Sequence, residues 1–172
     1  MQKLVIAMSI LFFLSGCSVG IPANAKAVEG FDADRYLGKW YEIARLENRF
    51  EKGLEKVTAE YSLRKDGGLT VVNRGYDPKK DRWSEANGKA YFVKAPTQGR
   101  LKVSFFGPFY GAYNIFSLDE DYRWSLVCGK DYAYLWILSR TPQLPEPVVK
   151  QLVQKARELG FKTDELLFVN QE

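Results

Sequence analysis

Between Trp40 and Arg140, hydrophobic and polar residues alternate in short runs that are separated by turn-forming sequences. The runs VTAEYSL (residues 57–63) and RLKVSFF (residues 100–106) carry apolar residues at every second position. Because successive side chains of a strand point to opposite faces, this period predicts strands with one buried face. The close spacing of the runs, with turn signals such as the Asp-Gly pair in KDGG between them, predicts an antiparallel barrel or sandwich.

After Pro142 the hydrophobic period becomes that of a helix. Apolar residues recur at helical spacing through residues 148–159, and Gly160 follows as a stop signal. The segment is therefore expected to form an amphipathic helix with one side to bury. A last short strand is predicted at LLFV, residues 166–169.

The run YAYLWILS, residues 132–139, is apolar at nearly every position. This pattern is typical of a strand that is covered on both faces. We expect Leu135 and Ile137 to lie beneath the helix. The side chains on the opposite, inward face are predicted to be Tyr134, Trp136 and Leu138.

The pair Asn87-Gly88 leaves two interpretations open. It is a strong signal for a two-residue hairpin. Its flanks, WSEA and KAYFV, equally fit one long strand with a bulge at the glycine. No inward face is assigned to this segment.

Taken together, these elements predict an all-β protein, an eight-stranded antiparallel up-and-down β-barrel with a C-terminal α-helix packed outside and a short final strand. Eight closed strands leave an interior wide enough for side chains or for one small ligand, and closure removes exposed edges. A flattened sandwich fits the same pattern and stays open.

The N-terminus has the layout of a secretory signal peptide, with Lys3 ahead of an apolar run and small residues after it. The tetrad LSGC, ending at Cys17, resembles a bacterial lipobox. This resemblance implies removal of residues 1–16 and lipidation of Cys17, which would anchor the protein in a membrane. Residues 17–30 would then be a lipid-anchored tether, followed by one domain at residues 31–172.

Two further residues bear on the destination. By the same resemblance, Ser18 in place of an aspartate implies passage to the outer membrane, where we expect the protein to face the periplasm. Ordinary cleavage after the small-residue pattern that ends at Ala25 is the open alternative, and it would release a free periplasmic protein.

Composition excludes several classes of function. The 172 residues include no histidine, which removes the commonest general base and the commonest zinc ligand, so we predict no catalytic residues, no metal and no cofactor. The net charge of +4 is mild, and the sequence lacks the basic stripe typical of nucleic-acid binding. Cys128 would have no disulfide partner if Cys17 is lipidated, and its apolar setting favours a small core residue over a reactive thiol.

The stretch GKWYEIAR, residues 38–45, resembles the opening of the lipocalins, whose first signature is Gly-x-Trp. Gly38 and Trp40 match it, and Arg140 in LSRTP matches the arginine that follows the last barrel strand of that family. The resemblance implies that this arginine packs across the tryptophan at the closed end, which a cation-π attraction explains. Asp119 matches a further aspartate after the sixth strand. Together with the lipobox, the chain is similar to bacterial outer-membrane lipocalins of the apolipoprotein D branch.

This resemblance implies a protein that binds fatty acids or lysophospholipids. The predicted inward faces are apolar and aromatic, which suits an acyl chain. The residues that we expect to line the ligand site are Ala59, Tyr61, Val71, Asn73, Val103, Phe105, Tyr113, Ile115, Tyr134 and Trp136.

Three alternatives stay open at this stage. The protein could be a structural envelope lipoprotein that binds a protein partner, or an enzyme that uses Cys128 as nucleophile, although no histidine is present to activate the thiol. A homodimer is also open, because the rim of such a barrel is often apolar, although the sequence indicates no particular interface. GPFYGAY, residues 107–113, fits two interpretations equally: Phe109 and Tyr110 lie at the open rim, or the stretch forms a buried loop corner.

Overall fold

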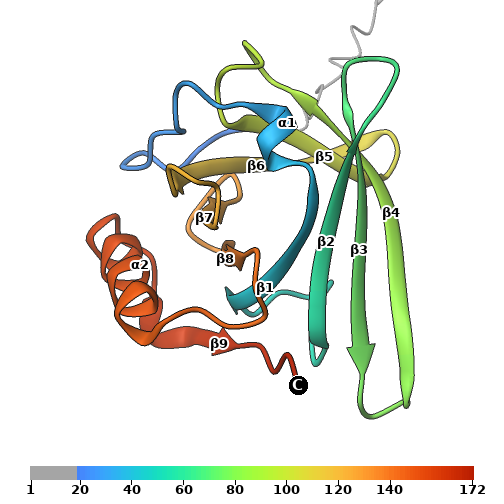
Figure 1. The fold of residues 1–172 in the computed structure, drawn as a ribbon, viewed down its shortest axis with the longest axis vertical. Helices are drawn as coiled ribbons and strands as arrows, with labels where there is room; N and C mark the ends of the chain where they lie inside the picture. The colour runs from blue at the N-terminus through green and yellow to red at the C-terminus, as the bar shows by residue number, and fades with distance from the viewer. Residues whose placement is uncertain (1–18) are drawn as a thin grey trace, which may run out of the picture.

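The computed structural model describes residues 19–172. The signal-peptide and lipidation predictions, including Cys17, lie outside the described residues. Nine strands form one sheet in the order β2-β3-β4-β5-β6-β7-β8-β1-β9 (Figure 1). Their bounds are Gly38–Leu46 (β1), Glu55–Leu63 (β2), Leu69–Asp77 (β3), Arg82–Phe92 (β4), Arg100–Phe106 (β5), Phe109–Leu118 (β6), Trp124–Cys128 (β7), Leu135–Ser139 (β8) and Leu166–Phe168 (β9).

The sheet closes on itself because β1 pairs with both β2 and β8. Trp40 lies opposite Ala59 of β2, and Glu42 lies opposite Leu138 of β8. Every pair of neighbouring strands around the barrel, from β1 through β8, is antiparallel. The predicted up-and-down barrel is therefore confirmed, and the sandwich is excluded.

The Asn87-Gly88 pair lies inside one long strand. β4 pairs with β3 without a register shift from Ala90 to Arg82, so neither the hairpin nor a bulge against β3 forms. A Cβ on Gly88 would approach the Phe105 ring to 2.8 Å and the main-chain oxygen of Ser104 to 2.9 Å. The glycine thus permits close packing against β5 rather than a turn.

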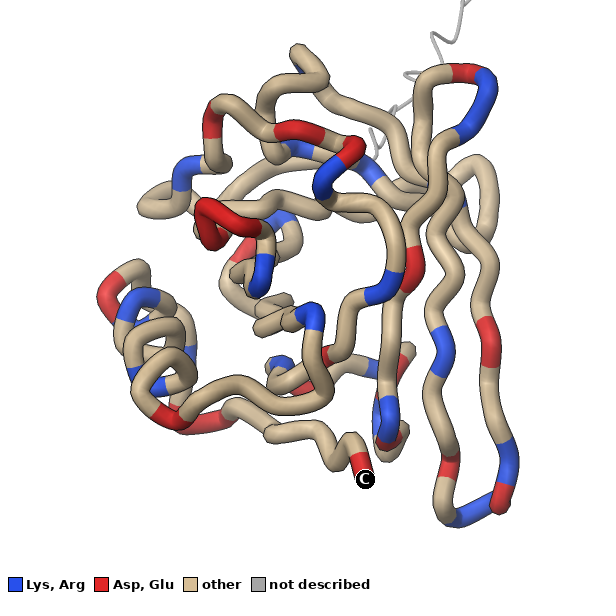
Figure 2. Tube along the Cα trace, viewed as in Figure 1, with Lys and Arg blue, Asp and Glu red and all other residues tan. Residues whose placement is uncertain are grey.

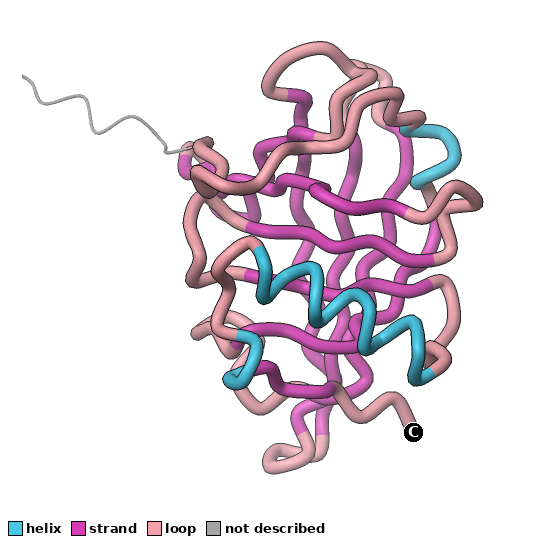
Figure 3. Tube along the Cα trace, turned by 90° about the vertical axis from the view of Figure 1, so that its left-hand side faces the viewer, coloured by secondary structure: helices cyan, strands magenta, loops and turns pink. Residues whose placement is uncertain are grey.

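A short helix α1 (Ala33–Tyr36) precedes the barrel, and a longer helix α2 (Glu146–Glu158) follows it. In Figure 3, α2 lies across the outer face of the strands that face the viewer. Leu152 and Ala156 of α2 are buried in one cluster with Leu135 and Ile137 of β8, as predicted. Of the helices in residues 19–172, none combines the length and apolar character needed to cross a bilayer.

After α2 the chain returns to the barrel. A 3-10 turn, η1 (Thr163–Glu165), leads into β9, which pairs with β1. Phe161 stacks on Phe116 of β6 with their ring centroids 5.7 Å apart. The C-terminal segment is therefore held by packing and main-chain hydrogen bonds.

Residues 19–30, which the sequence suggests as a tether, lie against the barrel. Val28 donates its amide to the oxygen of Ile115 at 2.9 Å and accepts from the amide of Gly99 at 2.9 Å. Ala25 is buried in the cluster beneath α2. The segment from Val19 onward is thus part of the folded unit.

Candidate functional site

One end of the barrel is closed by Trp40 and Arg140. Trp40 is fully buried, and the Arg140 guanidinium lies 4.0 Å from the centroid of its ring. A cation over an indole face is attracted by the negative face of the ring. Gly38, with φ +87°, begins β1 directly beside this contact. Arg140 also donates to the main-chain oxygens of Arg35, Leu37 and Lys39.

Asp119 organises the neighbouring turn between β6 and β7. Its carboxylate accepts from the Arg123 guanidinium at 2.7 Å and 2.9 Å and from the amide of Asp121 at 3.1 Å. These hydrogen bonds, chiefly those from Arg123, lower the pKa of Asp119. The Arg140 amide in turn donates to the oxygen of Arg123 at 2.8 Å, so the turn and the closed end support each other.

Three tyrosines fill the barrel above the closed end. The hydroxyl groups of Tyr36 and Tyr61 each lie 2.8 Å from that of Tyr113, and Tyr36 also lies 3.2 Å from the hydroxyl of Ser125. Burial raises the pKa of Tyr36 to about 12 and raises that of Tyr61 and Tyr113. The three phenols therefore stay neutral at physiological pH and satisfy one another as hydrogen-bond partners.

Farther along β1, at the end of the strand away from Trp40, Glu42 and Arg45 are both buried. A register shift between Glu42 and Ala44 places Arg45 opposite Trp136 of β8. Arg45 is fully buried; its Nη1 donates to Glu42 Oε1 at 2.6 Å and its Nη2 donates to the oxygen of Glu51 at 2.7 Å. Its Nε has no hydrogen-bond partner among the described residues, so one buried donor is unused.

Glu51 enters this arrangement from the β1–β2 loop. Its Oε2 accepts from the indole Nε1 of Trp136 at 3.0 Å and from Nδ2 of Asn48 at 2.6 Å. Burial, together with the negative charge of Glu51, raises the pKa of Glu42, and the Arg45 guanidinium offsets only part of this rise. We call Glu42, Arg45, Asn48, Glu51 and Trp136 the mouth cluster.

The structure brings most of the predicted ligand-lining residues into one cluster inside the barrel, together with Trp40, Leu69 and Leu138. The predicted residues in this cluster are Ala59, Tyr61, Val71, Val103, Phe105, Tyr113, Ile115 and Trp136. They share the inward face, and their contact with a ligand stays a prediction.

Two predicted lining residues lie apart from that cluster. Asn73, opposite Ala59 on β3, has a buried Oδ1 with no partner among the described residues. Tyr134 precedes β8, which begins only at Leu135, so the prediction that Tyr134 belongs to the last barrel strand is wrong. Tyr134 lies in the β7–β8 loop, is half-buried, and stacks on Trp136 with their ring centroids 5.9 Å apart. Its contact with a ligand stays a prediction.

Cys128 lies on the other side of the barrel wall. It is fully buried in the cluster beneath α2, and burial raises the pKa of its thiol to about 12. A nucleophilic cysteine needs a stabilised thiolate and access to substrate. Neither condition is met at this position. Within residues 19–172, no three or more acidic, histidine or cysteine side chains gather as a metal site.

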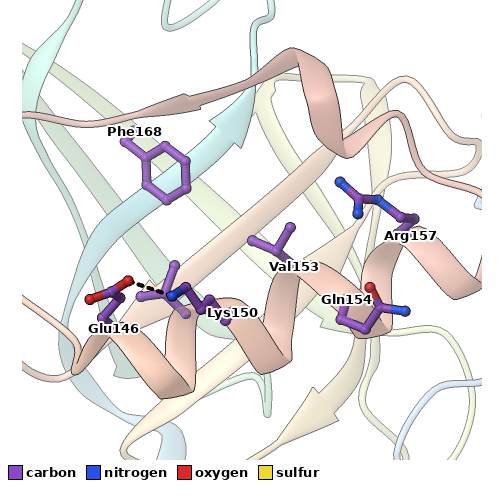
Figure 4. A pocket seen from close by; sticks show the side chains of 7 residues that line it. Glu146, Lys150, Val153, Gln154, Arg157 and Phe168 are labelled. Carbon is purple, nitrogen blue, oxygen red and sulfur yellow. Dashed lines mark ion pairs between the residues drawn. The ribbon is translucent and has the colours of Figure 1, made fainter.

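A hollow of about 650 Å³ lies outside the barrel, between α2 and β9. In Figure 4, Lys150, Val153 and Arg157 extend from α2 on the side that faces Phe168. Its charged groups are already engaged: Lys150 pairs with Glu146 at 2.6 Å, and Arg157 pairs with Asp164 at 2.9 Å. The hollow thus lies between the helix and the last strand, and the charged side chains Lys150 and Arg157 that line it are already in ion pairs.

Sequence reasoning missed the mouth cluster apart from Trp136. The inward position of Glu42 follows from alternation with Trp40, and this signal could have been used. The inward position of Arg45 depends on the bulge after Glu42, which has no clear signature in EIAR. Tyr36 was also missed, because it lies in a four-residue helix with no strand period.

Comparison with known proteins gives consistent matches. The lipocalin-like domain family matches residues 31–171. Outer membrane lipoprotein Blc of Escherichia coli strain K12 is 53% identical over 169 residues, which cover 98% of this chain and 96% of that protein. Apolipoprotein D of Mus musculus is 30% identical over 150 residues, covering 83% of this chain and 78% of that protein. The structure of insecticyanin from the tobacco hornworm Manduca sexta has a TM-score of 0.70 at 22% identity, covers 88% and 86% of the two chains, and supports the fold alone.

Proposed function

The chain belongs to the lipocalin family, and on that premise we propose that it is a non-catalytic carrier that holds one fatty acid or lysophospholipid inside its barrel. Lipid binding is consistent with the family as a whole. The choice of these two ligand classes is our proposal.

The observation that carries this proposal is the combination of an apolar interior with unused polar atoms. The cluster inside the barrel is dominated by aromatic and aliphatic side chains. Burial of an acyl chain among such groups is favourable by about 0.8 kcal/mol per methylene. Arg45 Nε and Asn73 Oδ1 are buried without a partner among the described residues, and a polar headgroup would supply one.

We place the carrier at the bacterial outer membrane, facing the periplasm and anchored through a lipidated Cys17. The support is the LSGC tetrad and the similarity to a protein named as an outer membrane lipoprotein. Mass spectrometry of the N-terminal peptide from membranes should find acyl groups on Cys17, and Cys17→Ala should abolish them. An unmodified peptide that begins at Lys26 would instead support cleavage after Ala25 and a free periplasmic protein.

Ligand binding is tested with the domain from Ser18 onward, stripped of bound lipid. Titration with lysophosphatidylethanolamine and with palmitate, followed by tryptophan fluorescence, should show saturable one-to-one binding for at least one of them. Trp136 lies in the mouth cluster, so its fluorescence is expected to change when a ligand binds. If neither lysophosphatidylethanolamine nor palmitate shows saturable binding, the carrier proposal fails and a structural role is favoured.

A pair of variants on β2 locates the site. Ala59→Phe adds a ring inside the barrel and is expected to weaken binding at least about tenfold, because the ring occupies the space of the acyl chain. Thr58→Phe, on the opposite face of the same strand, should leave binding unchanged. Circular dichroism and thermal unfolding check that both variants fold. Equal binding by the two folded variants would place the ligand outside the barrel.

A further inference from the structure

The hairpin formed by β5 and β6 ends in two exposed aromatic rings. Phe106 and Phe109 lie opposite each other across the turn, and each side chain is 73% exposed. Single exposed apolar residues are common on protein surfaces, whereas two adjacent exposed rings mark a surface that meets an apolar partner. We call Phe106 and Phe109 the hairpin tip.

Basic and aromatic side chains lie on the outer face beside the hairpin tip, and the adjoining Asp66, which accepts from the Tyr91 hydroxyl at 3.0 Å, is paired with Arg64. Lys102 of β5 lies 5.0 Å from the ring centroid of Tyr110, and the rings of Tyr110 and Tyr91 are 6.3 Å apart. Residues 86–118 contain no aspartate or glutamate, and their four basic residues are Lys89, Lys94, Arg100 and Lys102. Figure 2 shows the turn between β5 and β6 free of acidic residues. Such a surface complements anionic phospholipid headgroups.

The N-terminal segment begins on the same hairpin. The oxygen of Val19 accepts from the Arg100 guanidinium at 3.0 Å, and the oxygen of Gly20 accepts from Asn114 Nδ2 at 3.0 Å. Asn114 follows Phe109 of the hairpin tip by five positions along β6, a span of about 17 Å at ~3.3 Å per residue. Cys17 stands two residues before Val19, and these two residues add at most about 7 Å of reach.

From this geometry we propose that the hairpin tip inserts into the headgroup region of the membrane that holds Cys17, so that the barrel lies with its β5–β6 edge on the bilayer. Because Val19 contacts the base of the hairpin and Cys17 is two residues away in sequence, a single membrane surface can meet both the proposed anchor and the hairpin tip. The aromatic rings enter the interface, where phenylalanine and tyrosine side chains are stabilised, and Lys102 lies near the phosphates. The orientation rests on the proposed lipidation, whereas insertion of the tip does not.

A membrane fits this surface better than a second copy of the chain. In a symmetric dimer through the hairpin tip, both copies would bring the same basic surface, with Lys89 and Lys102, to the interface. Like charges across an interface oppose association. Anionic lipid carries the opposite charge and accepts both rings.

The test uses the domain from Ser18 onward, without its anchor, in flotation with vesicles of phosphatidylethanolamine and phosphatidylglycerol. The wild-type domain should float with these vesicles and float less with phosphatidylcholine alone. Phe106→Ser with Phe109→Ser should lower the bound fraction at least about tenfold. The matched control, Leu63→Ser with Phe168→Ser, removes two exposed apolar side chains elsewhere and should bind as the wild type does.

Each other outcome has a definite meaning. Equal flotation of the two double variants, or no flotation of the wild type, overturns the proposal. A wild-type dimer in sedimentation velocity that the tip variant abolishes, without vesicle binding, identifies a second copy as the occupant. The lysophospholipid titration is run on the wild-type domain and on the tip variant. A tip variant that binds lysophospholipid but does not float separates the carrier function from membrane docking. A wild-type domain that floats but does not bind lysophospholipid contradicts the carrier function and leaves the docking proposal in place.

Discussion

At the scale of single residues, Glu42 and Arg45 are a buried carboxyl group and a buried guanidinium group, and burial of either in its charged form costs free energy. Both are buried, and a buried charge is tolerated only when it is paired or neutralised. Arg45 donates to Glu42, while Glu51 adds a second carboxyl nearby. Burial and the neighbouring Glu51 raise the pKa of Glu42, so folding favours the protonated form of Glu42 relative to the unfolded chain.

This arrangement predicts a pH-dependent contribution to stability. Because the folded pKa of Glu42 lies above its ordinary value of 4.5, the folded state binds one proton more than the unfolded state in the interval between the two values. The contribution is complete below pH 4.5 and is lost as pH rises through the folded pKa. Over that interval the free energy of unfolding should fall by up to about 1.4 kcal/mol per pH unit.

Glu42→Gln isolates this contribution, because glutamine keeps an oxygen for Arg45 and resembles the protonated acid. Urea unfolding across this pH range should show a flatter dependence for the variant, with the variant gaining relative to wild type as pH rises. Glu60→Gln, which removes a carboxylate from the outer surface of β2, controls for lost charge. Parallel pH profiles for wild type and Glu42→Gln would mean that Glu42 is ionised in the folded state.

At the scale of strands and helices, periodicity predicts best where one face is buried and the other meets water. The alternation in VTAEYSL correctly places Val57 and Tyr61 inside, although Leu63 at the strand end is exposed. It fails where a long-range contact decides the conformation. Asn87-Gly88 has the local chemistry of a turn, yet its neighbours pair in unbroken register with β3, and Phe105 from another strand occupies the space beside the glycine.

That contact makes Gly88 a sensitive position. Gly88→Ala should destabilise the protein by about 1–3 kcal/mol, since its Cβ would overlap the Phe105 ring and the Ser104 oxygen. Gly111→Ala on β6 is the matched control, because its Cβ would meet nothing closer than 4.0 Å. Denaturant midpoints of the two variants give the comparison. Equal stability of both would show that β4 and β5 can separate slightly without loss.

At the scale of the whole molecule, the barrel and its external helix were predictable because each element repeats one pattern over many residues. The mouth cluster was not, since Arg45 faces inward only through a bulge and Glu51 arrives from a loop. The closed end was accessible through family resemblance, which supplied Gly38, Trp40 and Arg140, and the structure adds the main-chain oxygens that hold the arginine.

The packing of residues 19–30 has a consequence for how the chain is processed. A protease that cut after Ala25 would sever Gly20 from Asn114 and Ala25 from the core beneath α2, and so would leave an apolar gap in the mature protein. Cleavage before Cys17 removes none of these contacts. Cleavage at the lipobox therefore keeps the packing of residues 19–30, which cleavage after Ala25 would disrupt. For the same reason, a soluble form of the protein should begin at Ser18 rather than at residue 31.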